Sequence, residues 1–195
     1  GTMAGAVLVA SKVIFLSEAN AQIVAPIQSK DAATASVVVL GQKVATTPLT
    51  QFVDQSSPSG QPLRTIAYAD LTVADRIDVR AYKDAAGNLV ATRVVRTEPD
   101  PLLIAKAAVD AKFPVTRMTV LGITATTSPS TRYRDVLGNL IAAVDFYNLV
   151  QVPPALPTIV RAQGVADPAS DSTLDATRTT STHGSANSNH HAPTM

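Results

Sequence analysis

The chain of 195 residues contains no cysteine and no tryptophan, and aromatic residues make up only 4% of it. Without cysteine it forms no disulfide, no thiolate metal site and no cysteine nucleophile. Apolar residues still account for 46% of the chain, so valine, isoleucine, leucine and alanine must build the core. A core rich in β-branched residues favours strands over helices.

Charge is also scarce. Charged residues make up 16% of the chain, below the usual quarter. Sixteen basic and fifteen acidic residues give a net charge of +1, so no overall field attracts nucleic acid or an anionic membrane. No apolar run reaches the roughly 18 residues of a membrane-spanning helix. We therefore expect neither nucleic acid nor a membrane span.

Three stretches of similar sequence organise the chain. Residues 84–95 (DAAGNLVATRVV) predict a turn that leads into a strand, residues 4–14 (AGAVLVASKVI) repeat much of it, and residues 174–180 (LDATRTT) are a weaker copy. Val9 corresponds to Val90, an offset of 90 − 9 = 81. The same offset persists without gaps over about 70 positions, which indicates an internal duplication.

Each copy of the duplicated unit has the pattern of short strands separated by turns. We predict an all-β fold with one short helix, in which two tandem small antiparallel β-barrel modules are related by the 81-residue repeat. Gly41 interrupts a valine-rich strand and predicts a bulge or sharp bend. Apolar spacing over residues 140–149 predicts the helix.

The predicted organisation has four parts. The polar end of the chain is rich in Ser, Thr, Asp, Asn and His without a visible period, so we expect it to be disordered or weakly ordered. The parts are an N-terminal orphan strand at residues 1–19, module 1 at 20–98, module 2 at 99–166 and the polar tail at 167–195.

Two groups of phrases resemble a known bacterial family. Residues 69–79 (ADLTVADRIDV) with residues 84–94 form the first, and the second combines residues 119–122, 132–135 and 145–147. They are similar to the tandem modules of domain-of-unknown-function family 5666, over about residues 4 to 166. Ala74 stands where the family has a glycine. The resemblance implies export and a β-rich module, and it carries no catalytic residues.

Candidate catalytic and metal-binding residues all have simpler explanations. The three histidines, His183, His190 and His191, lie in the polar tail, where adjacent histidines on a loose segment bind metal weakly. Asp54 and Asp135 occupy equivalent positions in the two modules, and aspartate in turns accepts local hydrogen bonds. We therefore expect no enzyme activity, no cofactor and no metal.

The N-terminal stretch at residues 5–16 belongs to neither predicted module. Its apolar run, followed by small residues at 19–21, resembles a signal peptide, but no basic segment precedes it and Lys12 interrupts it. The internal repeat explains the run better, so we expect an already processed chain. A long apolar strand without a partner promotes aggregation, so something must cover it.

Two partners can cover this strand. Within one chain, it can pack on module 1 as an extra edge strand. Between chains, it can enter the second module of a neighbour by β-strand addition, which propagates head to tail. A fragment of a longer array would leave the same unpaired strand. The predicted donor residues are Val7, Leu8, Val9, Val13, Ile14, Phe15 and Leu16.

The expected function follows from these patterns. We expect an exported bacterial protein, located in the periplasm, at the cell surface or outside the cell, that serves as a non-enzymatic structural subunit. Its expected partner is itself, in a homo-oligomer or filament. The alternative is a periplasmic or surface module that binds a small ligand or glycan, which requires a concave pocket with convergent polar groups.

Overall fold

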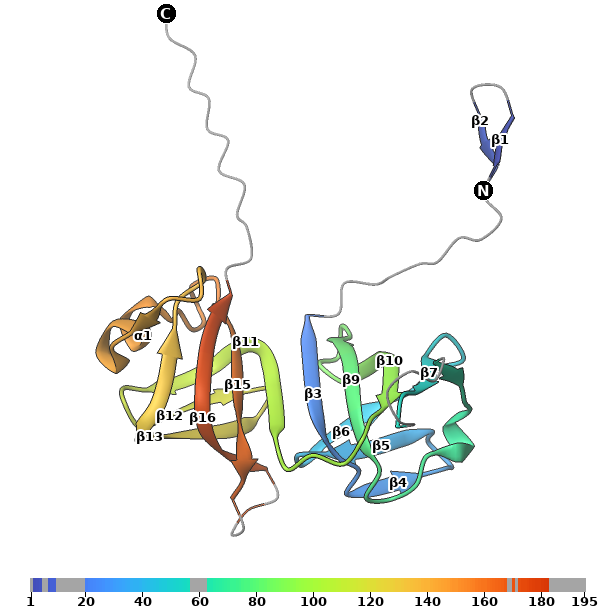
Figure 1. Ribbon diagram of the computed structural model, residues 1–195, viewed down its shortest axis with the longest axis horizontal. Helices are drawn as coiled ribbons and strands as arrows, with labels where there is room; N and C mark the ends of the chain where they lie inside the picture. The colour runs from blue at the N-terminus through green and yellow to red at the C-terminus, as the bar shows by residue number, and fades with distance from the viewer. Residues whose placement is uncertain are drawn as a thin grey trace, which may run out of the picture.

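The computed structural model describes residues 2–4, 7–9, 20–56, 63–167, 170 and 172–182. Over this part of the chain the fold is all-β, with one short α-helix, α1 (Ala143–Leu149), and one 3-10 turn, η1 (Tyr68–Asp70). Figure 1 shows two small barrels side by side. The predicted fold class is confirmed.

The first barrel has the strand order β4–β5–β6–β10–β9–β3. Its first strand bends after Pro26 and continues as β4, and its third strand is divided into β6 and β7. The bounds are β3 (Ala21–Pro26), β4 (Ser29–Asp31), β5 (Ser36–Val39), β6 (Gln42–Ala45), β7 (Gln51–Asp54), β9 (Arg76–Lys83) and β10 (Leu89–Arg96).

The second barrel repeats this order with fewer breaks. Its strands run β12–β13–β16–β15–β11, and pairing of β11 with β12 closes the ring. The bounds are β11 (Leu103–Phe113), β12 (Arg117–Val120), β13 (Ile123–Arg134), β15 (Ile159–Ala166) and β16 (Thr173–Thr182).

Each barrel is closed by a parallel pair of strands. β10 runs parallel to β6 and β7, and β16 runs parallel to β13, whereas the other pairs within the barrels are antiparallel. A helical turn lies between the third and fourth strands of each barrel, η1 in the first and α1 in the second. This five-stranded Greek-key arrangement is that of the oligonucleotide- and oligosaccharide-binding barrel, which by itself assigns no function.

Three short elements complete the strands. β8 (Arg64–Thr65) pairs with β7, and β14 (Leu140–Ile141) pairs with β13. At the N-terminus, β1 (Thr2–Ala4) and β2 (Val7–Val9) form a separate two-stranded antiparallel sheet.

Tight hairpins connect the second and third strands of each barrel. Leu40 and Gly41 have φ angles of 48° and 69°, and Leu121 and Gly122 have φ angles of 57° and 74°. Two successive residues with positive φ make a type I′ turn, which matches the twist of the strands it joins. Gly41 therefore marks a hairpin between two strands, where a bulge or sharp bend had been predicted.

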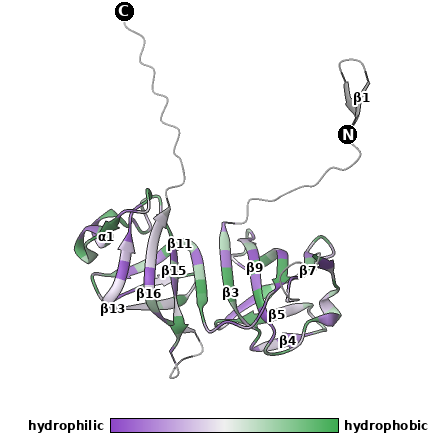
Figure 2. Ribbon diagram, in the orientation of Figure 1, coloured by the Kyte–Doolittle hydropathy of each residue, from purple (hydrophilic) through white to green (hydrophobic). Residues whose placement is uncertain are grey.

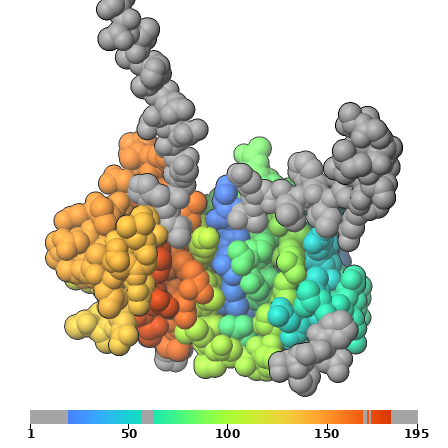
Figure 3. Space-filling model, turned by 45° about the horizontal axis from the view of Figure 1, so that its top comes forward, coloured from blue at the N-terminus to red at the C-terminus, as the bar shows by residue number. Residues whose placement is uncertain are grey.

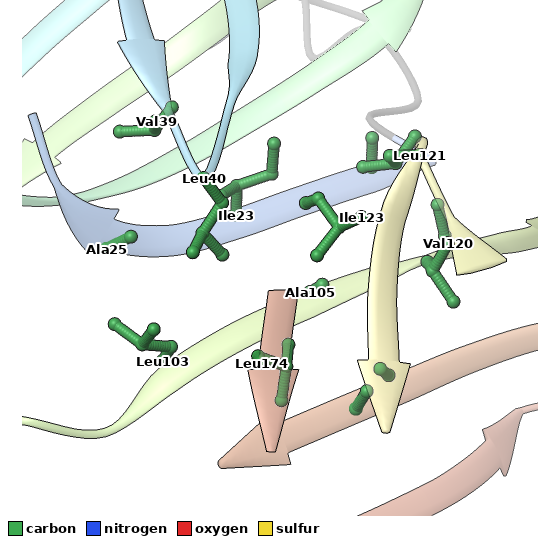
Figure 4. Packing of buried hydrophobic residues seen from close by; sticks show 14 of the residues in the cluster. Ile23, Ala25, Val39, Leu40, Leu103, Ala105, Val120, Leu121, Ile123 and Leu174 are labelled. Carbon is green, nitrogen blue, oxygen red and sulfur yellow. The ribbon is translucent and has the colours of Figure 1, made fainter. Parts of the chain in front are cut away.

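The two barrels join through their equivalent first strands. β3 and β11 pair antiparallel, with Ile23 opposite Ala105, so one sheet runs through both barrels. In Figure 3, β3 lies at the junction of the barrels, and in Figure 4, Ile123 of the second barrel reaches toward Ile23. Leu40 and Leu121 are only 4% exposed. The hydrophobic core is therefore continuous from one barrel to the other.

One end of each barrel is closed by its helical turn. In the second barrel, Phe146 of α1 is fully buried and its ring centroid lies 5.2 Å from that of Tyr133. Phe52, the counterpart of Tyr133, packs edge-to-face on Tyr68 of η1 in the first barrel. The predicted helix begins three residues later than the predicted range and ends at Leu149, as its apolar spacing indicated.

The second barrel extends beyond the boundary predicted at residue 166. β16 lies between β13 and β15, so the first part of the expected tail is a barrel strand. Its pale colour in Figure 2 reflects threonine and serine, the composition that predicted disorder. Residues 183–195, with the three histidines, lie outside the described residues.

Candidate functional site: the closing strands of the two barrels

The closing strands β10 and β16 share a sequence pattern and a position. Both contain a leucine, then an alanine two residues later, then threonine and arginine. Leu174 and Ala176 face the barrel interior, with exposed fractions of 0% and 4%. Leu89 and Ala91 are buried in the same way in the first barrel. The offset here is 174 − 89 = 85, because four additional residues lie between the matching parts of β15 and β16.

A threonine anchors each closing strand at its irregular point. Thr50 Oγ1 donates to the carbonyl of Ala91 at 2.7 Å, and Thr131 Oγ1 donates to the carbonyl of Ala176 at 2.6 Å. The pairing of β10 with β9 shifts register after Ala91, and the pairing of β16 with β13 shifts register after Ala176. The anchor accepts any residue at that position of the closing strand, because it binds a backbone carbonyl.

A lysine at the end of each first strand caps the helical turn that closes its barrel. Lys30 Nζ donates to the carbonyls of Ala69 and Leu71, and Lys112 Nζ donates to those of Tyr147 and Val150. Lysine satisfies the free carbonyls at a helix C-terminus in this way. Sequence reasoning missed these two residues, although their offset of 112 − 30 = 82 lies one residue from the repeat.

An ion-pair cluster surrounds the end of β10. The Asp54 side chain is 3% exposed, and Arg96 Nη2 lies 2.6 Å from its Oδ2. Arg64 Nη2 lies 2.7 Å from the same oxygen, and the Ser56 N–H donates to Oδ1. The hydrogen bonds from Arg96, followed by those from Ser56, hold the pKa of Asp54 far below its ordinary value. The prediction of a local turn role for Asp54 is confirmed but incomplete, because the ion pairs were not foreseen.

The equivalent place in the second barrel has no such cluster within the described residues. Asp135, the counterpart of Asp54, accepts the N–H groups of Leu137 and Asn139 at 2.9 and 2.8 Å, the turn role that was predicted. Ser181 stands where β10 has Arg96. Its hydroxyl and that of Thr179 are buried without a hydrogen-bond partner in the described part of the chain.

The predicted donor residues lie only in part within the described chain. Val7, Leu8 and Val9 form β2, which pairs with β1. Val13, Ile14, Phe15 and Leu16 lie outside the described residues. By sequence, Leu8, Ala10, Val13 and Phe15 correspond to the four inward-facing residues of β16, at an offset of 174 − 8 = 166.

The described residues contain no group of histidine, cysteine, aspartate and glutamate side chains that could hold a metal ion. In the same part of the chain, no helix combines the length and the apolar character needed to cross a membrane.

An open groove of about 510 Å³ lies where the barrels meet. The first barrel contributes the start of β6 and the β9–β10 hairpin, and the second contributes β11, β12 and the turn after β12. The lining residues are Gln42, Lys43, Lys83, Gly87, Asn88, Leu89, Asp110, Thr119, Leu121 and Gly122. The groove exists only because the two barrels are in contact.

Comparison with known proteins finds a match to a family described as a domain of unknown function. No curated protein and no solved structure matches the chain. Ala74, at the position of the family's glycine, has a left-handed φ of 72°, the conformation that glycine adopts most easily. The family model described as Domain of unknown function (DUF5666) matches residues 24–95, so most of the first barrel resembles that domain.

Proposed function

We propose that the protein is a non-enzymatic structural subunit of an extracellular or cell-surface assembly. Its subunits join head to tail when residues 5–16 of one chain enter the second barrel of a neighbour in place of β16. One observation carries the proposal: β16 buries the hydroxyls of Thr179 and Ser181 without partners in the described residues, and the N-terminal copy has Val13 and Phe15 at those positions.

The side chains make the free energy of the exchange favourable, and the backbone hydrogen bonds change it little. A buried hydroxyl without a partner costs about 1–3 kcal/mol. The N-terminal strand removes two of them and keeps a leucine and an alanine where β16 has Leu174 and Ala176. The bond from Thr131 to a backbone carbonyl is available to either strand.

Two local structures must open before the exchange. β16 must leave the space between β13 and β15. β2 must also separate from β1, with which it forms three residue pairs. An isolated two-stranded hairpin has little stability in water, so β1 is a weak competitor. The slow step is therefore the release of β16.

Strand addition between chains is a heterologous contact. The donor lies at one end of the chain and the acceptor is the second barrel, so the contact propagates into a filament unless it closes into a ring. Export of the protein is part of this proposal and is supported by the resemblance to DUF5666 and by the low charge of the chain.

A pair of matched variants tests the donor strand. In the exchanged strand, Val13→Asp places a charge at the inward-facing position of Thr179, whereas Ser11→Asp places the same charge at the exposed position of Thr177. We expect size-exclusion chromatography with light scattering to show monomers for V13D and the oligomers of the parent chain for S11D. Equal assembly of both variants, or no assembly of the parent chain, would overturn the proposal.

A disulfide tests the register. In the closed barrel, Arg178 of β16 lies opposite Arg132 of β13, and Lys12 is the N-terminal counterpart of Arg178. Because the chain has no cysteine, a chain with Lys12→Cys and Arg132→Cys carries only the two introduced thiols. Oxidation should give covalent dimers and higher ladders on a non-reducing gel. A control with Lys12→Cys and Arg93→Cys, the latter at an exposed position of β10, should not.

The second candidate function is the binding of a small ligand or glycan. The groove between the barrels favours it, because its volume of about 510 Å³ lies in the range of small-molecule sites. Polar side chains from both barrels converge there.

A further inference from the structure

Two glycines line the groove, and one of them faces open space. Gly87 lies in the β9–β10 hairpin of the first barrel and Gly122 in the hairpin after β12 of the second. Their counterparts on the other side of the β3–β11 pair are Ser172 and Gly41, which touch: a Cβ on Gly41 would lie 2.8 Å from Cβ of Ser172. A Cβ on Gly87 would meet nothing within 4 Å. Contact between Gly41 and Ser172 thus closes one side of the junction, whereas on the other side Gly87 faces open space and the Gln42 side chain lies against Gly122.

Three polar side chains lining the groove form no hydrogen bond or ion pair within the described residues: the Gln42 amide, the Lys43 ammonium and the Thr119 hydroxyl. Lys83 and Asp110 form an ion pair across the groove at 3.6 Å, but both side chains are substantially exposed, so the pair contributes little stability. Asp110 also accepts the Gly122 N–H at 2.9 Å. Lys43 interacts electrostatically with Asp31, but its ammonium forms no direct ion pair within the described residues and can receive an anion.

Two of the residues that line the groove are leucines. Leu89 is 6% exposed and Leu121 is 4% exposed, so their side chains belong to the core and present a small apolar surface to the groove. An apolar floor with a rim of donors and acceptors suits a sugar ring, which has a C–H face and peripheral hydroxyls. A free ammonium on the rim suits a carboxylate.

We propose that the groove binds a small uronic acid, either free or as the end of an acidic glycan. Lys43 holds the carboxylate, Gln42, Thr119 and Asp110 hold ring hydroxyls, and Leu89 and Leu121 contact the C–H face. This inference deepens the second candidate function. It is independent of strand addition, because no lining residue belongs to β16 or to residues 5–16.

The test uses the whole chain and galacturonic acid oligomers of two or three units. Binding is followed by calorimetry and by the amide NMR signals of Gly87 and Gly122. We expect both amides to shift on titration, and Lys43→Met to weaken binding at least tenfold, while Lys43→Arg restores most of it. Arg132→Gln, which removes an exposed charge from the far end of β13, should bind as the parent chain does.

Three outcomes would overturn the inference. Neutral galactose oligomers that bind as tightly as the acids would show that Lys43 does not hold a carboxylate. Inorganic phosphate that displaces the acids at equal concentration would reduce the site to a general anion site. No shift of either glycine amide at millimolar acid would exclude the groove. None of these results bears on filament formation, which is measured separately with V13D.

Discussion

β10 and β16 occupy the same place in their barrels but are held there by different forces. Both contain the same leucine, alanine, threonine and arginine pattern, and both run parallel to the third strand. β10 then buries Val94 and ends in Arg96, which is paired with Asp54. β16 instead buries two hydroxyls without partners in the described residues. The comparison shows that the barrel needs a strand between its third and fourth strands, but that different side chains can hold this strand in place.

The largest effect should come from breaking the ion pair of β10. Arg96→Ala leaves the Asp54 carboxylate, 3% exposed, with the largely exposed Arg64 as its remaining ion-pair partner. We expect a loss of about 3 kcal/mol in the free energy of unfolding, measured by urea denaturation. Arg93→Ala, on the exposed face of the same strand, should change stability by less than about 0.5 kcal/mol. Similar losses for both variants would contradict the assigned role of Arg96.

Acid should weaken the first barrel through the same carboxylate. Because the pKa of Asp54 is depressed by Arg96, the unfolded chain takes up a proton at about pH 4 while the folded chain does not. The stability from this group is present above pH 4 and is lost as the pH falls below it. Urea denaturation from pH 7 to pH 3 should show this loss, and Asp54→Asn should reduce it.

The control for the pH experiment is Glu98→Gln, which removes an exposed carboxylate from the link between the barrels. The stability of this variant is measured beside that of D54N and of the parent chain at each pH. Asp84 and Asp135, whose pKa values are also lowered by hydrogen bonds from Asn88 and Asn139 in their turns, add to the same slope in every variant. An unchanged slope in D54N would rule out Asp54 as the main source.

A substitution in β16 should increase the stability of the protein. Thr179→Val removes a buried hydroxyl without a partner while preserving its shape, and it gives β16 the valine that β10 has at Val94. We expect a gain of about 1–2 kcal/mol and, if β16 must leave for assembly, slower oligomer growth. The reciprocal Val94→Thr should destabilise the first barrel by a similar amount. A loss of stability in T179V would show that the hydroxyl has a partner.

The smallest effect concerns the turn before β9. Ala74 has a φ of 72°, a conformation that costs an alanine about 1 kcal/mol more than a glycine. Ala74→Gly should raise the free energy of unfolding by about that amount or slightly less, because glycine also adds freedom to the unfolded chain. Ala86→Gly, in the exposed β9–β10 turn, has no positive φ to relieve and should not stabilise.

The sequence revealed the repeated strands because Val, Ile and Leu alternate along them, and it revealed the type of the helix at Phe146 by its spacing. It misjudged β16 because that strand buries Thr179 and Ser181, residues that composition counts as polar. The recurring leucine, alanine, threonine and arginine did mark residues 174–180 as a weak return strand of the second module, although the composition of residues 167–195 placed them in the tail. The parallel closing pair was not visible, because strand direction depends on contacts distant in sequence.

The groove could not be predicted from the sequence pattern of either module alone. Lys43 and Thr119 belong to different barrels, and only the pairing of β3 with β11 brings their elements to one place. The two glycines that line it have the positive φ angles of ordinary turn residues, so the sequence gives no sign of their place in a groove. Sites at the junction of repeats are therefore the least accessible to reasoning from a single sequence.

The antiparallel pairing of β3 with β11 also has a consequence for counting. Equivalent strands meet near a local two-fold axis, with Ile23 opposite Ala105. The edge of the first strand of each barrel is therefore occupied by the other barrel and is not available to a third barrel. Barrels joined in this way come in twos. An array with an odd number of them would leave one row of backbone amides and carbonyls uncovered, an aggregation risk that favours duplication by pairs.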